Sequence, residues 1–439
     1  MITKENKKLA QWAMEYALKN GCQASRVQLY NGSSNSFEVR DMKIDRLQQA
    51  SENSLAIQLF VDGRFGTYST NRLDKKEIER FIKEGIATTR FLAEDEARTL
   101  PDASRYYKGG QPDLQLRDPD FEKVNPDEML GLAMQTCAEM QGKDERIISA
   151  NSSFSNDEAS RYLVASNGFE GETTNSTFSL VASLSIRGEG EARPESYWYD
   201  AALYFKDLKK EGIGRKALER VLNKLGQRKA ASGKYTMVVD NMNAANLLSP
   251  LIEALDGSAI QQKNSFLLDK LGQKVLSEKI VLTDEPHTAK AMGARYFDNE
   301  GVATKRMPIF EQGVLRTYFI DTYRANKMGV EPTISSPSLL VMQPGATDLN
   351  GLIGGIDKGI LVTGFNGGNC NSTTGDFSYG VEGFLIDKGR LAHPVSEMNV
   401  TGNMLTLWGN VAAIGNDPRL ASSWRIPSMA FSNVDFSGL

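Results

Sequence analysis

The sequence predicts an α+β protein with an N-terminal α+β domain built on an antiparallel sheet, a middle α/β segment and a β-rich C-terminal domain. Three observations predict this class. Apolar residues recur at helical spacing near the N-terminus, strand-like runs and Gly turns follow them, and the chain beyond residue 283 is mostly short strand-like runs. We place the boundaries at residues 1–93, 94–127, 128–230 and 231–439, with residues 94–127 as a linker or surface excursion.

The first domain is expected to open with a helix that ends at Asn20-Gly21. Its apolar stripe consists of Leu9, Trp12, Ala13, Tyr16 and Ala17. Strand-like runs follow at residues 26–30, 36–47, 55–61 and 65–69. The dipeptides Asn31-Gly32 and Asp62-Gly63 are expected to form the hairpin turns between these runs. Asp74 is the expected N-cap of a second helix.

Proline and glycine mark residues 94–127 as irregular. The markers are Pro101, Pro112, Pro119, Pro126 and Gly109-Gly110. A helix capped near Asn125 is expected to open the middle segment, and strand-like runs from residue 147 to residue 185 turn at Asn167-Gly168. A long helix is expected over residues 207–229.

The C-terminal domain is expected to begin with a strand over residues 235–240 and a helix over residues 241–255. Pro250 lies inside that helical pattern. Either one helix kinks there, or a new helix begins with Ser249 as its cap. Later strands are expected at residues 377–386, 405–414 and 428–435.

Composition indicates a cytoplasmic protein. The net charge is −4, and no basic stripe stands out, which argues against a nucleic-acid partner. No apolar run is long enough to predict a membrane span, and residues 1–8 lack the apolar core of a signal peptide. The three cysteines, Cys22, Cys137 and Cys370, are too scattered for a disulfide framework.

Histidine and cysteine are also too few for a multi-ligand metal site. The histidines, His287 and His393, and the three cysteines share no ligand spacing such as C-x-x-C or H-x-x-x-H. Two alternatives stay open at this point: a Ser-His-Asp triad assembled from distant positions, and Cys370 as a nucleophile.

Residues 364–389 form a glycine-punctuated segment that leads into a strand-like run. Glycine allows close approach of another backbone, which suits a peptide laid beside a strand. Tight turns in a β-rich domain are the alternative interpretation. The candidate peptide-binding residues are Asn369, Ser372, Thr373, Thr374, Gly375, Asp376, Phe377 and Ser378.

Two segments resemble a known family: residues 241–275, and the pattern Thr-Gly-Asp-Phe-Ser-x-Gly within residues 374–380. The chain resembles the TldD/TldE (PmbA) family and, within it, the TldE (PmbA) type. Aligned on Leu255-Asp256-Gly257, the family's zinc motif His-Glu-x-x-x-His falls on Leu248, Ser249 and Glu253. Residues 421–423 lack the Cys that completes the zinc site in TldD-type members. We therefore expect no catalytic residue and no metal ligand in this chain.

The resemblance implies a cytoplasmic zinc metalloprotease of two subunits with one fold, which enclose a chamber and cut unfolded peptides. Zinc is expected only in the TldD-type partner, and this chain is expected to be the non-catalytic subunit of a heterodimer, or a homodimer in isolation. One alternative is a stand-alone regulator that binds peptides or modulates DNA gyrase. Another is an independent hydrolase that uses Cys370 or a triad.

Overall fold

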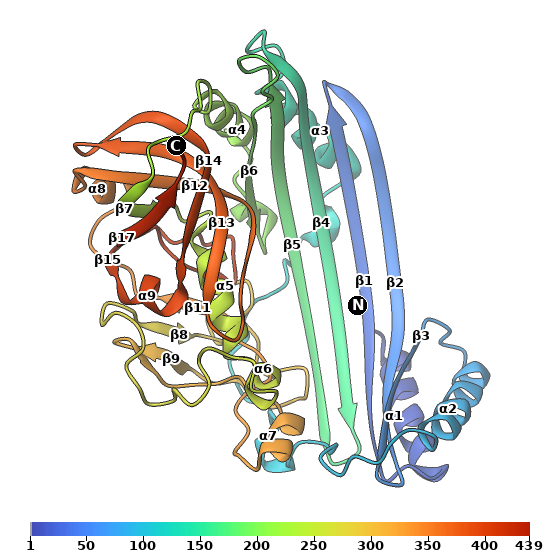
Figure 1. Cartoon of the computed structure of the whole chain (residues 1–439). Helices are drawn as coiled ribbons and strands as arrows, with labels where there is room; N and C mark the ends of the chain where they lie inside the picture. Colours follow the sequence, from blue (N-terminus) through green and yellow to red (C-terminus); the bar gives the residue numbers. More distant parts are fainter. Residues whose placement is uncertain (1) are drawn as a thin grey trace.

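The computed structural model describes residues 2–439 and has the predicted α+β fold (Figure 1). Its largest element is a six-stranded antiparallel sheet in the order β3-β2-β1-β4-β5-β6. The strands are β1 (Ala24–Arg40), β2 (Lys43–Val61), β3 (Arg64–Thr70), β4 (Ile147–Ala165), β5 (Phe169–Ile186) and β6 (Glu195–Ala202). Because β1 pairs with both β2 and β4, strands from the first 93 residues and from beyond residue 128 share one sheet.

One predicted turn is wrong. β1 continues through Asn31-Gly32, and the chain reverses instead at Asp41-Met42, with φ values of 50° and 63°. Asn31 pairs with Asn53 of β2 on one side and with Ser160 of β4 on the other, so two ladders hold this stretch extended against its local turn preference. The turns predicted at Asp62-Gly63 and Asn167-Gly168 are confirmed, since they join β2 to β3 and β4 to β5.

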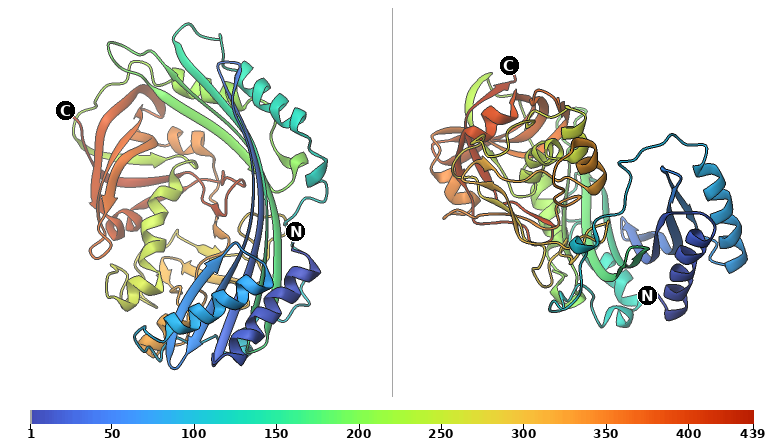
Figure 2. Two further views of the ribbon diagram at one scale, coloured as in Figure 1. Left: turned by 90° about the vertical axis from the view of Figure 1, so that its right-hand side faces the viewer. Right: turned by 90° about the horizontal axis from the view of Figure 1, so that it is seen from below.

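Helices cover one face of the long sheet, and the C-terminal region lies over the other (Figure 2). The helices are α1 (Lys4–Lys19), α2 (Lys75–Thr89), α3 (Pro126–Ala138) and α4 (Ile213–Leu222). Side chains alternate along the strands, so apolar residues such as Phe154 and Phe178 pack beneath α3, fully buried. The opposite face therefore carries the small polar residues between them, such as Ser153 and Ser155.

The helix expected over residues 207–229 is shorter in the structure, where α4 begins after Gly212 (φ 77°). The carboxylate of Glu139 accepts hydrogen bonds from the backbone N–H groups of Gly212 at 2.7 Å and Gly214 at 2.8 Å. A carboxylate at this position satisfies N–H groups that have no partner within the helix, which fixes the start of α4. No helix within residues 2–439 is long and apolar enough to cross a membrane.

The C-terminal region is rich in strands, as predicted, and contains two sheets, in the orders β10-β9-β8-β11-β16 and β14-β13-β12-β7-β17-β15. The first consists of β8 (Leu282–Asp284), β9 (Met307–Glu311), β10 (Val314–Leu315), β11 (Leu340–Met342) and β16 (Trp424–Arg425). The second consists of β7 (Gly233–Val239), β12 (Lys358–Cys370), β13 (Asp376–Asp387), β14 (Arg390–Asn403), β15 (Val411–Ile414) and β17 (Met429–Ser437). The helices are α5 (Ala244–Ala254), α6 (Gly257–Gln261), α7 (Thr322–Met328), α8 (Leu349–Gly354) and α9 (Met404–Gly409).

The strand predicted over residues 405–414 is half wrong, because α9 occupies its first part. The side chain of Asn403 accepts the backbone N–H of Leu405 at 3.0 Å and so caps this helix. Only β15 remains of the predicted strand. Strand β6, which forms one edge of the long sheet, was not predicted at all.

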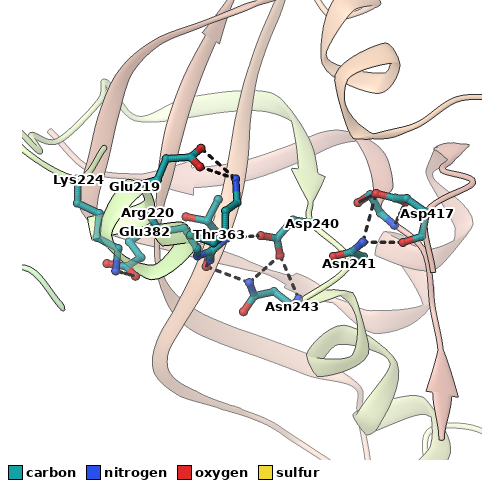
Figure 3. A network of polar contacts seen from close by, with 11 residues as sticks. Glu219, Arg220, Lys224, Asp240, Asn241, Asn243, Thr363, Glu382 and Asp417 are labelled. Carbon is teal, nitrogen blue, oxygen red and sulfur yellow. Dashed lines mark hydrogen bonds and ion pairs between the residues drawn. The ribbon is translucent and has the colours of Figure 1, made fainter. Parts of the chain in front are cut away.

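Two features connect the long sheet to the C-terminal region: a stretch of irregular chain and a network of polar side chains. Residues 94–125 contain only short 3₁₀ turns as helical structure, and α3 begins at Pro126. Tyr106 from this segment packs on Phe169 of β5 with ring centroids 5.0 Å apart. The second connection is a network of charged and amide side chains between α4 and the sheet that contains β7 and β12 (Figure 3). In this network Arg220 lies 3.6 Å from Asp240.

The buried carboxylate of Asp284, at the end of β8, leads to a prediction about how stability depends on pH. Asp284 is 1% exposed, and burial raises its pKa to about 6 even though it accepts the N–H groups of Ser338 and Leu339. The folded chain therefore holds this proton more tightly than the unfolded chain does. The resulting stabilisation is complete below a pH of about 4 and is lost as the pH rises through about 6, at a cost of roughly 3 kcal/mol.

The substitution Asp284→Asn keeps an acceptor for both N–H groups and removes the ionisation. We expect the free energy of unfolding of the natural chain, measured by denaturant titration, to fall relative to that of the variant between about pH 4 and about pH 7. Asp74→Asn, at the exposed cap of α2, is the matched control for an aspartate-to-asparagine exchange outside the core. Parallel pH profiles for the natural chain and Asp284→Asn would contradict the prediction.

Candidate functional site

The candidate site is centred on α5, where the sequence alignment places the degenerate motif. The apolar side of this helix packs into the core, and Leu248 is 1% exposed within it. Ser249 and Glu253 lie on the outer side, one turn apart, and the Ser249 hydroxyl donates a hydrogen bond to a Glu253 carboxylate oxygen at 2.7 Å. α5 is one helix from Ala244 to Ala254 with Pro250 inside it, so the alternative of a new helix beginning at Ser249 is wrong.

The residues at the motif positions do not fit a zinc ion. Zinc in proteases takes about three His, Asp, Glu or Cys ligands that converge on one point. Here Leu248 is an apolar side chain in the core, and the Ser249 hydroxyl is bonded to the one carboxylate of the set, that of Glu253. Nowhere in residues 2–439 do three or more His, Cys, Asp or Glu side chains lie together in a way that could hold a metal.

The remaining candidate nucleophiles have no activating partner in the described chain. Cys370 is partly buried, and burial, together with the nearby charges of Glu253 and Asp376, raises the pKa of its thiol. A raised pKa disfavours the thiolate that nucleophilic chemistry needs. His287 bonds to the hydroxyl of Thr304 at 3.0 Å, and His393 bonds to the carbonyl of the next residue. Within residues 2–439 the hydrogen bonds of the two histidines thus go to a threonine hydroxyl and a backbone carbonyl, and not to a serine or cysteine.

An open cleft of about 550 Å³ lies beside the outer side of α5. We call it the α5 cleft. Its lining includes Ser249, Glu253, Asn264, Pro337 and Trp424. The sequence indicated the first two of these positions but gave no signal for Asn264 or Trp424. The tertiary fold, and not a local sequence pattern, brings these two residues to α5. The cleft combines an aromatic ring with hydroxyl, amide and carboxylate groups.

The predicted peptide-binding loop, residues 369–378, is a tight connection between β12 and β13. The side chain of Asn371 accepts the N–H groups of Thr373 and Thr374 at 2.9 and 3.2 Å. Gly375 has a φ of 79° and donates its N–H to the carbonyl of Asn371. Hydrogen bonds from Asn403 and Thr374 lower the pKa of Asp376. The loop is therefore held in one shape by its own side chains and by that of Asn403.

The loop meets the α5 cleft at Asn264. The hydroxyl of Ser372 contacts the Asn264 side-chain oxygen at 3.0 Å, and Thr373 donates to the same oxygen. Phe377 is 5% exposed and belongs to the core, so its ring is not available to a ligand. Strand β13, which follows the loop, is paired with β12 on one side and β14 on the other. It offers no free edge to an added peptide strand.

This chain is similar to known proteins along nearly its whole length. Three blocks match the models of PmbA/TldA metallopeptidase domains: domain 1 at residues 26–89, the central domain at residues 119–225 and the C-terminal domain at residues 232–438. A crystal structure of a proposed modulator of DNA gyrase from Bacteroides thetaiotaomicron is 66% identical, with a TM-score of 0.99 and coverage of 100% of both chains. The chain belongs to the PmbA/TldD family.

More distant relatives carry the names of the same family. A protein named metalloprotease PmbA homolog from Haemophilus influenzae is 27% identical over 99% of this chain and 96% of its own length. The crystal structure of TldE from Thermococcus kodakarensis is 20% identical, with a TM-score of 0.85 and coverage of 98% of this chain and 100% of that one. At that identity the likeness concerns the fold alone.

Proposed function

We propose that this chain is the non-catalytic partner subunit of a TldD-type zinc metalloprotease that degrades or processes unfolded peptides in the cytoplasm. The observation that carries the proposal is the state of α5. Relatives of this chain carry metalloprotease names, yet here a core leucine, Leu248, and a hydroxyl–carboxylate pair, Ser249 and Glu253, occupy the positions where the resemblance places the zinc motif. Zinc and the water it activates then come from the partner, and this chain helps to hold the peptide.

The test is hydrolysis of casein as an unfolded polypeptide. The assay compares this chain, its motif-bearing TldD-type paralogue and their mixture, each with and without a chelator. We expect cleavage in the mixture only, abolished by the chelator, because zinc is held by the partner. Cleavage by the purified chain alone would overturn the proposal and return attention to Cys370 and the histidines.

A second candidate function has one observation in its favour. The relative that is 66% identical carries the name of a modulator of DNA gyrase. A stand-alone regulator would bind peptides or gyrase without any paralogue. Supercoiling by purified gyrase, measured with and without this chain, tests it. A change in supercoiling rate in the absence of the paralogue, together with no cleavage in the mixture, would favour this second function.

A free strand edge supports the partner-subunit proposal. β3 pairs only with residues 55–61 of β2, so residues 43–54 are bonded to β1 alone. Residues 43–53 are exposed, and Ile44 and Leu47 are 50% and 55% exposed. An unpaired edge of this length with apolar side chains is a template for pairing with another chain. The TldD-type paralogue is the proposed occupant, since it would bring a matching edge of the same fold.

The double substitution Ile44→Lys, Leu47→Lys is expected to weaken binding to the paralogue by at least about tenfold. The reason is that the two lysine ammonium groups would have to lose their water when the paralogue covers the strand edge. Titration calorimetry of the two chains measures it. Leu391→Lys is the control, since Leu391 is similarly exposed, at 47%, but lies on β14. Equal affinities for the natural chain and the β2 variant would show that the partner docks elsewhere.

A further inference from the structure

A second cleft, of about 560 Å³, lies between the polar face of the long sheet and the C-terminal region. We call it the sheet cleft. One wall consists of inward-facing side chains from β1, β4 and β5, and the other comes from residues 291–299 and 337–338. It adjoins the α5 cleft, because Pro337 lines both and the consecutive residues Ser423 and Trp424 line one each. A single extended chain can therefore contact both clefts.

Arg161 is the charged side chain on the sheet wall of this cleft. The strand register places it in one row with Tyr30 of β1 and Thr173 of β5. Its side chain is exposed, and within residues 2–439 no hydrogen bond or ion pair reaches its guanidinium. An arginine that lines a cavity without a partner leaves all its N–H donors free for a ligand.

The space around Arg161 is kept open by small neighbours. Ala159, two positions along β4, lines the same cleft. In the neighbouring row, Gly32 lies beneath the ring of Tyr30, and a Cβ atom at Gly32 would come within 2.5 Å of the tyrosine oxygen. The tyrosine can therefore lie along the sheet surface instead of standing across the cleft.

The far wall does not neutralise Arg161. The carboxylate that lines the cleft, Asp298, is 3% exposed and accepts backbone N–H groups from Glu300 at 2.8 Å, Val302 at 3.0 Å and Ser335 at 3.1 Å. The other charged lining residue is a second cation, Arg295, whose guanidinium donates only to carbonyl and hydroxyl oxygens of residues 336–338. Burial lowers the pKa of Arg295; the charges of Asp298 and Asp284 oppose that shift, and the charge of Arg161 adds to it. Among the residues that line the cleft, two guanidinium groups therefore stand against one carboxylate.

We propose that the sheet cleft binds a carboxylate of the peptide through the free guanidinium of Arg161. This inference rests on the proposed function and adds a specificity-determining residue to it. The planar fork of arginine matches a carboxylate in a bidentate arrangement, with charge-assisted hydrogen bonds. Thr173 and Asn175 on the adjacent strand offer a hydroxyl and an amide to the peptide backbone. Arg161 positions the peptide and takes no part in bond cleavage.

The carboxylate can be the C-terminus of the peptide or an acidic side chain, and the experiment separates the two. The probes are a fluorescein-labelled Gly/Ser peptide with a free C-terminus, the same peptide as its C-terminal amide, and the amide with one internal glutamate. Their binding to the full-length chain is measured by fluorescence anisotropy. We expect the free acid or the glutamate peptide to bind about tenfold more tightly than the plain amide.

The variant Arg161→Gln should remove that difference, while Arg161→Lys should restore part of it. Arg46→Gln is the matched control: Arg46 is an exposed arginine of β2 on the same sheet, outside the cleft, and its loss changes the net charge equally. Equal binding of all three probes by the natural chain, or an acid preference that survives in Arg161→Gln, would overturn the proposal. The first comparison needs no variant, so it holds even if a variant fails to fold.

The binding experiment and the cleavage assay of the proposed function test different claims, so their outcomes can differ. Loss of the acid preference in Arg161→Gln with no cleavage by the paralogue mixture would support this site and reject the partner-subunit function. Zinc-dependent cleavage in the mixture with no acid preference would do the reverse.

Discussion

Replacing Trp408 with alanine is expected to lower the free energy of unfolding by about 3–5 kcal/mol. Trp408 is fully buried in α9 and meets Phe431 of β17 edge to face, with ring centroids 5.6 Å apart. Its indole N–H donates to the carbonyl of Leu247 in α5 at 3.3 Å. The substitution therefore opens a large apolar cavity and removes a hydrogen bond to the helix that carries the candidate site. Denaturant titration followed by circular dichroism measures the loss.

Two comparisons separate the cavity from the hydrogen bond. Trp408→Phe keeps an aromatic ring against Phe431 and loses the N–H, so a smaller loss of about 1–2 kcal/mol is expected. Trp12→Ala, at a half-buried tryptophan of α1 far from this core, should cost less than Trp408→Ala because part of that ring already meets solvent. A loss below about 1 kcal/mol for Trp408→Ala would mean that the core closes over the cavity and that α5 does not depend on it.

Sequence predicted the elements whose signals are local. The cap at Asp74, the turns at Asp62-Gly63 and Asn167-Gly168 and the start of α3 at Asn125 all depend on residues a few positions apart, and the structure confirms them. The failed turn at Asn31-Gly32 has the same local signal. What differs is that strands on both sides, one of them more than a hundred positions away in sequence, pair with it. Long-range pairing outweighed the local preference.

The features of the candidate site also divide into those that local sequence predicts and those that depend on distant parts of the chain. The apolar stripe of α5 could be read from its spacing, and so could the tight loop with Gly375, since both are properties of short segments. The contact of Asn264 with the loop, the position of Trp424 in the α5 cleft and the row formed by Tyr30, Arg161 and Thr173 could not. These juxtapositions depend on strand register and on how the C-terminal region lies over the sheet.

Replacing Asp240 with alanine is expected to cost about 3 kcal/mol, because the substitution removes a buried carboxylate and leaves the partly buried guanidinium of Arg220 without it. Asp240 follows β7 and is 4% exposed, and burial raises its pKa although Arg220 opposes that rise. It accepts hydrogen bonds from the backbone and side chain of Asn243 at 3.1 and 2.7 Å. Arg220 comes from α4 and donates to the Thr363 carbonyl of β12 at 3.4 Å (Figure 3). Its guanidinium also lies over the ring of Trp198.

Arg220 belongs to α4, which packs on the long sheet, and Asp240 belongs to the C-terminal region. Loss of this ion pair should therefore weaken the contact between the long sheet and the C-terminal region. A double-mutant cycle with Arg220→Met tests this. The double variant removes both charges and should be more stable than Asp240→Ala alone, with a coupling of at least about 1 kcal/mol. Glu219→Ala is the control on the same helix: its carboxylate pairs with Lys216 at the surface and should change stability by less than about 0.5 kcal/mol. Additive losses at Asp240 and Arg220 would instead mean that the 3.6 Å separation is too long for a stabilising pair, and that apolar packing alone holds α4 in place.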